Sequence, residues 1–282
     1  MSATAAPATA PRAAHTPVTT TRAAHASWLL QTWLVTRRWV TNSLRQPWGF
    51  GVTVIQPVIW IVLFGNVFKA VAQVPGFGTA DYLTFLVPGI LMMTMLYSGA
   101  WAGTGFIDDI KSGVMDRLLS SPVSRPALVA GQLVQQLLTS LLQGVVLLLI
   151  GWAAGARYAG GPGGMALALV AALLLAAAFC SVSAAVALTA RDQTALIGVS
   201  TIIVLPATFL SVALMPVTLL PHWVEAVSRC NPLTWATQIA RTALSPQVDG
   251  GILASRGGML LALAAVTYLW SVAAMRRYQR SL

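Results

Sequence analysis

The chain has 282 residues, of which 57% are hydrophobic and 9% are charged, and its mean hydropathy is +0.75. A soluble domain carries about 25% charged residues, so this composition excludes an ordinary soluble globular protein and predicts that lipid surrounds most of the chain. The net charge of +10 by itself would also suit a nucleic-acid-binding protein. The positions of the basic residues along the chain distinguish a membrane protein from a nucleic-acid-binding one.

The first 45 residues fall into two parts. Residues 1–25 are rich in Ala, Thr and Pro and lack the apolar core of a secretion signal, so they are predicted to be a disordered cytoplasmic tail. Residues 26–45 combine three Trp with one polar face on a helical wheel, formed by Gln31, Arg38, Asn42 and Arg45. This pattern predicts a helix that lies in the membrane interface. The alternative is a cytoplasmic extension of the first membrane span.

Six stretches without charge are long enough to cross a bilayer, which requires about 20 mainly apolar residues. They are Gln46–Phe68, Tyr82–Ile107, Pro126–Ala156, Tyr158–Ala190, Gln193–Val224 and Gly257–Met275. Backbone groups in lipid must be satisfied within their own segment, so each stretch should be a helix. The sequence therefore predicts an all-α integral membrane protein with six transmembrane helices, in which residues 26–282 form one transport domain.

The basic residues indicate the orientation of these spans. Six spans place both termini on one side, and twelve of the seventeen Lys and Arg residues then share that side. Positive charge marks the cytoplasm, so both termini are predicted to be cytoplasmic. Membrane topology thus explains the excess of basic residues. We expect the chain to contact membrane lipid and not to bind nucleic acid.

A charged segment at residues 106–125 separates the second and third spans. We expect one helix of about three turns here, with Asp108 and Asp109 near its N-terminus, where acids are favourable. Its apolar side would carry Val114, Met115, Leu118 and Leu119. Such a helix must face water and could lie in a groove of a soluble partner. The alternative is a loop that rests on lipid.

The third span begins with a polar stripe, formed by Gln132, Gln136, Thr139 and Gln143. The spacing of 4, 3 and 4 places the four side chains on one helical face. Polar groups inside a span usually face protein or water. The stripe therefore predicts either a path for a transported substrate or hydrogen bonds to a neighbouring helix or a second subunit. In the second span, Gly99 and Gly103 predict close packing against another helix.

The segment at residues 215–256 is too polar and too rich in Pro to be a further span. It predicts two short external helices before the last span, near Pro221–Arg229 and Pro232–Leu244. Each begins with Pro in its first turn, and Asn231 is placed to cap the second.

The residue types in these spans argue against a catalytic, nucleotide-binding or metal site in the chain. No G-x-x-x-x-G-K-[ST] motif is present, so the chain is not expected to bind a nucleotide by that route. Cys180 is the only ionisable group deep in a predicted span, and no metal-ligand spacing occurs. We therefore expect no catalytic residue, no metal and no cofactor in this chain, and a function driven by another molecule.

Three motifs, in order, resemble one family of membrane proteins. The run Gly113-x-x-Asp116-x-Leu118-Leu119-x-x-Pro122-Val123-Ser124-Arg125 is similar to the cytoplasmic loop signature of the membrane subunits of type-2 ATP-binding-cassette exporters. Phe85-Leu86-Val87-Pro88-Gly89 resembles the start of their second span. Leu220-Pro221-x-Trp223, then Asn231-Pro232-Leu233-Thr234-Trp235 and Arg241, resemble their outer segment. The daunorubicin-resistance type of drug permease is the most similar branch.

The resemblance implies a division of labour. Two six-helix subunits, either two copies of this chain or a pair of homologous permeases, would form the transport domain, and separate ATPase subunits would bind the ATP. It implies ATPase contact through the cytoplasmic coupling helix, by Asp108, Asp109, Gly113, Met115, Asp116, Leu118, Leu119, Pro122 and Arg125. It also implies that the short outer helices re-enter the outer leaflet and support an external gate, by Pro221, Trp223, Asn231, Pro232 and Trp235.

The function expected from this resemblance is export of an amphipathic small molecule, such as an antibiotic, across a bacterial plasma membrane. A lipid or a lipid-linked glycan is the alternative cargo. A membrane enzyme that acts on lipid, and a membrane anchor that recruits a partner without transport, are rival interpretations of another class.

Overall fold

The computed structural model describes residues 28–44, 47–67, 82–120 and 124–280, so the tail predicted at 1–25 lies outside them. Within these ranges the chain forms helices and no strand, which confirms the all-α class. The α-helices are α1 (Trp28–Leu44), α2 (Pro47–Val67), α3 (Tyr82–Trp101), α4 (Thr104–Lys111), α5 (Val114–Ser120), α6 (Arg125–Ala153), α7 (Gly161–Ala190), α8 (Gln193–Phe209), α9 (His222–Ser228), α10 (Pro232–Leu244) and α11 (Gly250–Arg280). A single 3₁₀ turn at Val217–Leu219 precedes α9.

Four helical segments are long and apolar enough to cross a membrane. They are Tyr82–Lys111, Pro126–Ala153, Gly161–Ala190 and Gly250–Arg280. Val54–Gly65 in α2 and Gln193–Phe209 in α8 are apolar but shorter. All six lie where the sequence predicts spans, and the chain is a multi-pass membrane protein. The full six-span topology stays a prediction.

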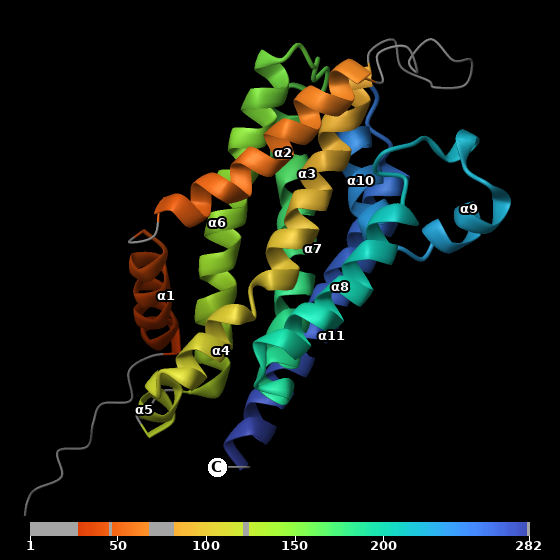
Figure 1. The fold of residues 1–282 in the computed structure, drawn as a ribbon. Helices are drawn as coiled ribbons and strands as arrows, with labels where there is room; N and C mark the ends of the chain where they lie inside the picture. Colours follow the sequence, from red (N-terminus) through yellow and green to blue (C-terminus); the bar gives the residue numbers. More distant parts are fainter. Residues whose placement is uncertain (1–27, 45–46, 68–81, 121–123, 281–282) are drawn as a thin grey trace, which may run out of the picture.

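Helix α7 lies at the centre of the bundle, and α3, α6, α10 and α11 pack around it (Figure 1). Its many Ala residues allow close approach. A Cβ atom at Gly99 or Gly103 of the α3 segment would come too close to the carbonyl oxygens of Ala176 and Ser183 in α7. The small-residue contact predicted for the second span is thereby confirmed, with α7 as the partner.

Helix α1 lies beside the first turns of α6 (Figure 1). The Thr36 hydroxyl donates to the Gly131 carbonyl at 3.2 Å, and the Ser124 backbone N–H donates to Gln31 at 2.9 Å. On the outward side, Trp33 is 61% exposed. An apolar outer face is what a membrane-associated helix requires. Its orientation in the interface plane stays a prediction.

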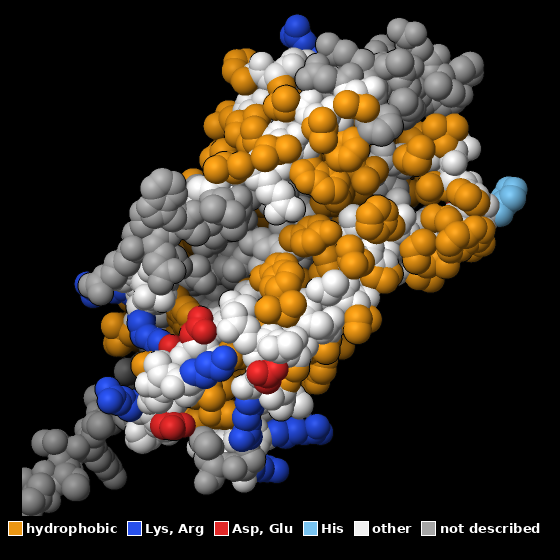
Figure 2. All heavy atoms as spheres, viewed as in Figure 1, with side chains coloured by type: hydrophobic (Ala, Val, Ile, Leu, Met, Phe, Trp, Pro, Cys, Tyr) orange, Lys and Arg blue, Asp and Glu red, His pale blue; other side chains and the backbone are white. Residues whose placement is uncertain are grey.

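Charge is distributed unevenly along the bundle. In Figure 2 the acidic and basic side chains gather mainly around α4, α5 and the last turns of α11, which we call the charged end. Most of the remaining described surface in this view is hydrophobic, over α2, α3, α8 and α9. We call the end that carries α9 and α10 the opposite end. This division is the one that a membrane domain with a water-facing end requires.

The charged segment after α3 differs from the prediction of one helix. Helix α4 ends at Lys111 and α5 begins at Val114. Gly113 has a φ of +68°, a left-handed conformation that glycine adopts at little cost and that ends a helix. Because α4 already begins at Thr104, Asp108 and Asp109 lie in its C-terminal half, and their predicted N-terminal position was wrong.

The fifth predicted span is also shorter than expected. Helix α8 ends at Phe209, whereas the sequence predicted a span to residue 224. Pro206 removes one hydrogen bond near the end of α8, the helix continues to Phe209, and residues 210–215 are bent and non-helical. The two short helices predicted before the last span are confirmed as α9 and α10, although Pro221 is the N-cap of α9 rather than its first residue. Their external location stays a prediction.

Candidate functional site

Helices α4 and α5 form a hairpin that is anchored in the charged end of the bundle. Phe106, Ile107 and Met115 are buried there. Their cluster includes side chains from several other helices, namely Val35, Leu128, Val129, Ala184, Leu188, Leu196, Met275 and Tyr278. The hairpin therefore has a hydrophobic root that belongs to the core, and a displacement of the hairpin would be felt by α1, α6, α7, α8 and α11.

An ion pair ties this hairpin to α1. Arg38 donates from Nη2 to Oδ1 of Asp109, whose side chain is only 10% exposed. Beside the pair, the Trp39 and Phe106 rings meet edge to face, with centroids 6.2 Å apart. A carboxylate at the C-terminal end of a helix opposes the helix dipole. The neighbouring guanidinium offsets that cost and makes the position of α4 depend on α1.

The outward side of the hairpin is charged. Asp108, Lys111, Asp116 and Arg117 are exposed, while Leu118 and Leu119 are half-buried. Of the residues predicted to touch an ATPase, Met115 and Asp109 thus face inward as supports. Pro122 lies outside the described residues. Arg125 begins α6, and the structure describes only its backbone.

A short non-helical turn separates α3 from the hairpin, and we call it the α3–α4 break. Helix α3 ends at Trp101 and α4 starts at Thr104, which leaves backbone groups without helical partners. The Ala100 carbonyl accepts from Ser183 of α7 at 2.6 Å and from Ser200 of α8 at 3.0 Å. Gln132 of α6 donates to the Ala102 carbonyl at 2.6 Å. One side chain from each of α6, α7 and α8 therefore binds the α3–α4 break.

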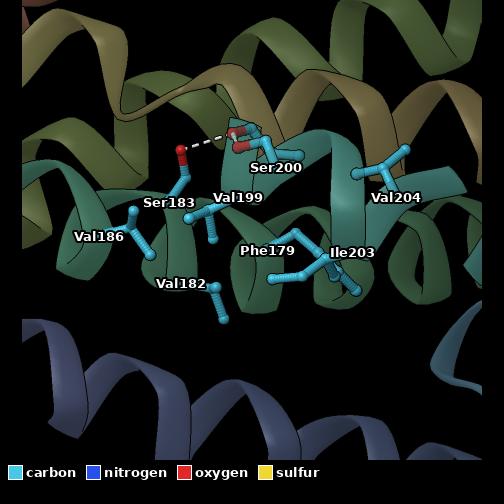
Figure 3. Close-up of a pocket in the computed structure, with 9 residues that line it drawn as sticks. Phe179, Val182, Ser183, Val186, Val199, Ser200, Ile203 and Val204 are labelled. Atoms are coloured by element: carbon cyan, nitrogen blue, oxygen red, sulfur yellow. Dashed lines mark hydrogen bonds between the residues drawn. The ribbon is translucent and has the colours of Figure 1, made fainter. Parts of the chain in front are cut away.

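A shallow crevice opens beside this break, between α7 and α8 (Figure 3). Ser183 and Ser200 approach one another at one side of it, and the walls are apolar, formed by Phe179, Val182, Val186, Val199, Ile203 and Val204. Ser200 provides a hydrogen bond that crosses from α8 to the end of α3. The crevice therefore lies directly beside that link.

The opposite end contains a second break, where α8 stops. Asn231 donates to the carbonyls of Ala207 and Leu210, at 2.7 and 2.9 Å, and accepts from the Leu233 N–H at 2.9 Å. This confirms the predicted cap of α10. The same side chain binds the frayed end of α8, a role that the sequence did not predict.

The four other residues predicted to support an external gate lie in or next to α9 and α10. Trp235 donates from its indole to the Arg229 carbonyl at 2.7 Å and closes the turn between α9 and α10. Pro232 occupies the first turn of α10, and Pro221 precedes α9. Trp223 projects outward and is 65% exposed. A gating role for these four stays a prediction.

The polar stripe of α6 lies against α3. Gln136 donates to the Ser98 hydroxyl at 2.7 Å, and Gln132 binds the α3–α4 break as described. Gln143 is buried and Thr139 half-buried. In this structure the two described glutamine contacts are to a neighbouring helix, which is one of the two alternatives that the sequence left open. A path for cargo along the stripe stays a prediction.

Comparison with known proteins decides the family. The sequence model described as ABC-2 type transporter matches residues 30–245, which contain the α4–α5 hairpin, both breaks and α10. The chain belongs to the ABC-2 type transporter family. The matched region runs from α1 to the end of α10, so of the contacts described above only those made by α11 lie outside it.

Curated relatives of this ABC-2 transporter include permeases named for drug resistance. It is 27% identical over 220 residues to the daunorubicin resistance ABC transporter permease protein DrrB1 of Streptomyces coeruleorubidus, covering 76% of each chain. The putative transport permease ycf38 of Porphyra purpurea is 27% identical over 69% of this chain and 67% of its own. The probable multidrug ABC transporter permease YbhR of Escherichia coli K12 is 27% identical over 70% of this chain and 53% of its own.

Three residues of this ABC-2 transporter matter more than the sequence suggested. Ser183 and Ser200 lie in apolar spans and carry no sequence signal beyond their polarity, and Arg241 belongs to a motif that predicts no contact for it. A signal for Arg241 is nevertheless present, because an arginine between Ala240 and Ala243 of a short helix before the last span requires partners if it is buried. Among the described residues, no group of three His, Cys, Asp or Glu could hold a metal ion, and Cys180 and Cys230 are free thiols.

Proposed function

We propose that this ABC-2 permease is the membrane subunit of an ATP-driven exporter of an amphipathic small molecule, such as an antibiotic. A separate ATPase would contact the α4–α5 hairpin, and a second permease subunit would complete the transport domain. Both termini and the charged end would face the cytoplasm of a bacterium, and α9 and α10 would lie at the outer leaflet.

One observation carries the proposal: the hairpin is rooted in the hydrophobic core but presents charges to water. A loop that only connected two spans would not need Phe106 and Met115 buried among side chains of five other helices. Its outward face offers Asp116 and Arg117 to a soluble partner. The permeases named for daunorubicin and multidrug resistance support a drug-like cargo.

The proposed chain of action runs from the hairpin to α8. A push on α4 would act on the α3–α4 break, and Ser200 links that break to α8. The walls of the crevice beside α8 are apolar, so Ser200 is a polar link between α8 and α3 in otherwise apolar surroundings. Movement of α8 would reach its far end, where it meets α10.

Reconstitution with the cognate ATPase in liposomes tests the function. We expect amphipathic drug-like compounds to stimulate ATP hydrolysis and to be transported. The Asp116→Lys variant should lose both activities, whereas Arg157→Glu, which changes an exposed charge at the opposite end, should keep them. Stimulation by lipid-linked sugars alone would contradict a drug-like cargo and favour the alternative. Stimulation of the Asp116→Lys variant at the unaltered level would contradict the hairpin as the contact.

A further inference from the structure

Arg241 of α10 donates to three backbone carbonyls on two other segments. Its Nη1 lies 2.7 Å from the Val212 oxygen, and its Nη2 lies 2.8 Å from the Ala213 oxygen. Nε and Nη2 both reach the Phe85 oxygen at 3.3 Å. The guanidinium carbon also lies 3.5 Å from the centre of the Phe85 ring. None of the ion pairs formed by the described residues includes Arg241.

The carbonyls of Val212 and Ala213 belong to the non-helical segment that follows α8. Val212 is 1% exposed and Ala213 is 0% exposed. Non-helical backbone within a membrane protein is tolerated only where protein or a water-filled cavity satisfies its polar groups. Arg241 satisfies both carbonyls at once, one from each Nη of its planar guanidinium.

The same segment is pressed against α3. A Cβ atom at Gly89 would clash with the carbonyl oxygen of Ala213. Gly89 lies one helical turn after Phe85, so both are on one face of α3. Arg241 therefore bridges the first turn of α3 and the broken end of α8 at the place where the two backbones touch.

We propose that Arg241 is a positioning residue of the outer gate, and that its guanidinium holds the end of α8 closed against α3. This inference rests on the proposed export function. An apolar residue would seal a permanent contact more simply, because a buried charge is costly to retain. A guanidinium suits a contact that opens, since water can replace the three carbonyls when the segment moves away.

The test measures access of water to residue 212 at rest and during turnover. A Val212→Cys variant in a Cys230→Ser background carries one thiol near the outer end, and Cys180 is buried. With Arg241 present, we expect slow labelling by a membrane-impermeant maleimide, and at least tenfold faster labelling when the cognate ATPase hydrolyses ATP. Adding Arg241→Gln or Arg241→Lys should make labelling fast without ATP and insensitive to it.

Controls separate gating from folding. Arg229→Gln changes an exposed arginine of the same end, which pairs with Glu225, and it should leave labelling slow. Phe85→Leu removes the ring under the guanidinium but keeps the backbone carbonyl, so a smaller increase in the labelling rate is expected. This variant provides the test if Arg241→Gln fails to fold. Unchanged slow labelling in folded Arg241→Gln and Phe85→Leu would overturn the inference. Fast labelling in Arg241→Gln, together with no ATP-driven transport by the unaltered complex, would contradict the exporter function. It would still support the contact that Arg241 makes between α8 and α3.

Discussion

At the charged end, the break between α3 and α4 is bound by the neutral side chains Ser183, Ser200 and Gln132. At the opposite end, the α8 break is bound by Asn231 and by the charged Arg241. Hydrogen bonds from a charged donor contribute about 1.5–3 kcal/mol each, against about 1 kcal/mol for neutral ones. The comparison indicates that the first break is the easier one to deform and that the second resists opening until it is driven.

The largest effect is expected from Asn231→Ala at the α8 break. The change removes the cap of α10 and leaves two carbonyls at the end of α8 without their donor. We expect a loss of roughly 2–4 kcal/mol in the free energy of unfolding, measured by chemical denaturation in detergent. Asn42→Ala, at an exposed position of α1, is the matched control. Equal stabilities of the two variants would show that the α8 break does not depend on this side chain.

The ion pair between Arg38 and Asp109 is expected to contribute less, because Arg38 is partly exposed. Replacing Arg38 by Met leaves a mostly buried carboxylate unpaired and should cost about 1–3 kcal/mol. The double variant with Asp109→Asn should recover most of this loss, since no unpaired charge then remains. Thermal unfolding of the two single variants and the double variant measures the coupling. Additive losses would contradict a direct pair.

The smallest effects are expected at the α3–α4 break, where Ala100 accepts two hydroxyls. Ser200→Ala leaves the bond from Ser183 in place and should cost about 0.5–1 kcal/mol. The double variant with Ser183→Ala should cost more than the sum of the single variants, because the carbonyl then has neither donor. A cycle of unfolding free energies tests this. Under the proposed function, Ser200→Ala should also lower export more than ATP hydrolysis.

Much of the fold follows from apolar length and from local signals. Helices α3, α6, α7 and α11 overlap long charge-free stretches, and Asn231 with Pro232 predicted the start of α10. The splitting of the charged segment at residues 106–125 was harder to predict, since Gly113 is a weak signal inside an amphipathic stretch. The burial of Asp109 could not be predicted at all, because its partner Arg38 lies 71 residues earlier.

The α8 break was missed for a related reason. An apolar sequence from Gln193 onward favours one long helix, and Pro206 alone does not end a span. The break becomes stable only because Asn231 and Arg241 on α10 bind the freed carbonyls. Contacts between segments more than 20 residues apart are not visible in a local pattern. The same holds for Ser183 and Ser200.

The central claim is that the α4–α5 hairpin receives the force of a separate ATPase. Cross-linking tests it most directly, with single thiols introduced by Asp116→Cys on the hairpin and by Asp249→Cys at the start of α11, in a Cys230→Ser background. The account predicts that a short maleimide cross-linker joins the cognate ATPase to position 116 and not to position 249, and that ATP changes the yield. Equal yields at the two positions, or a cross-link at position 249 alone, would contradict it.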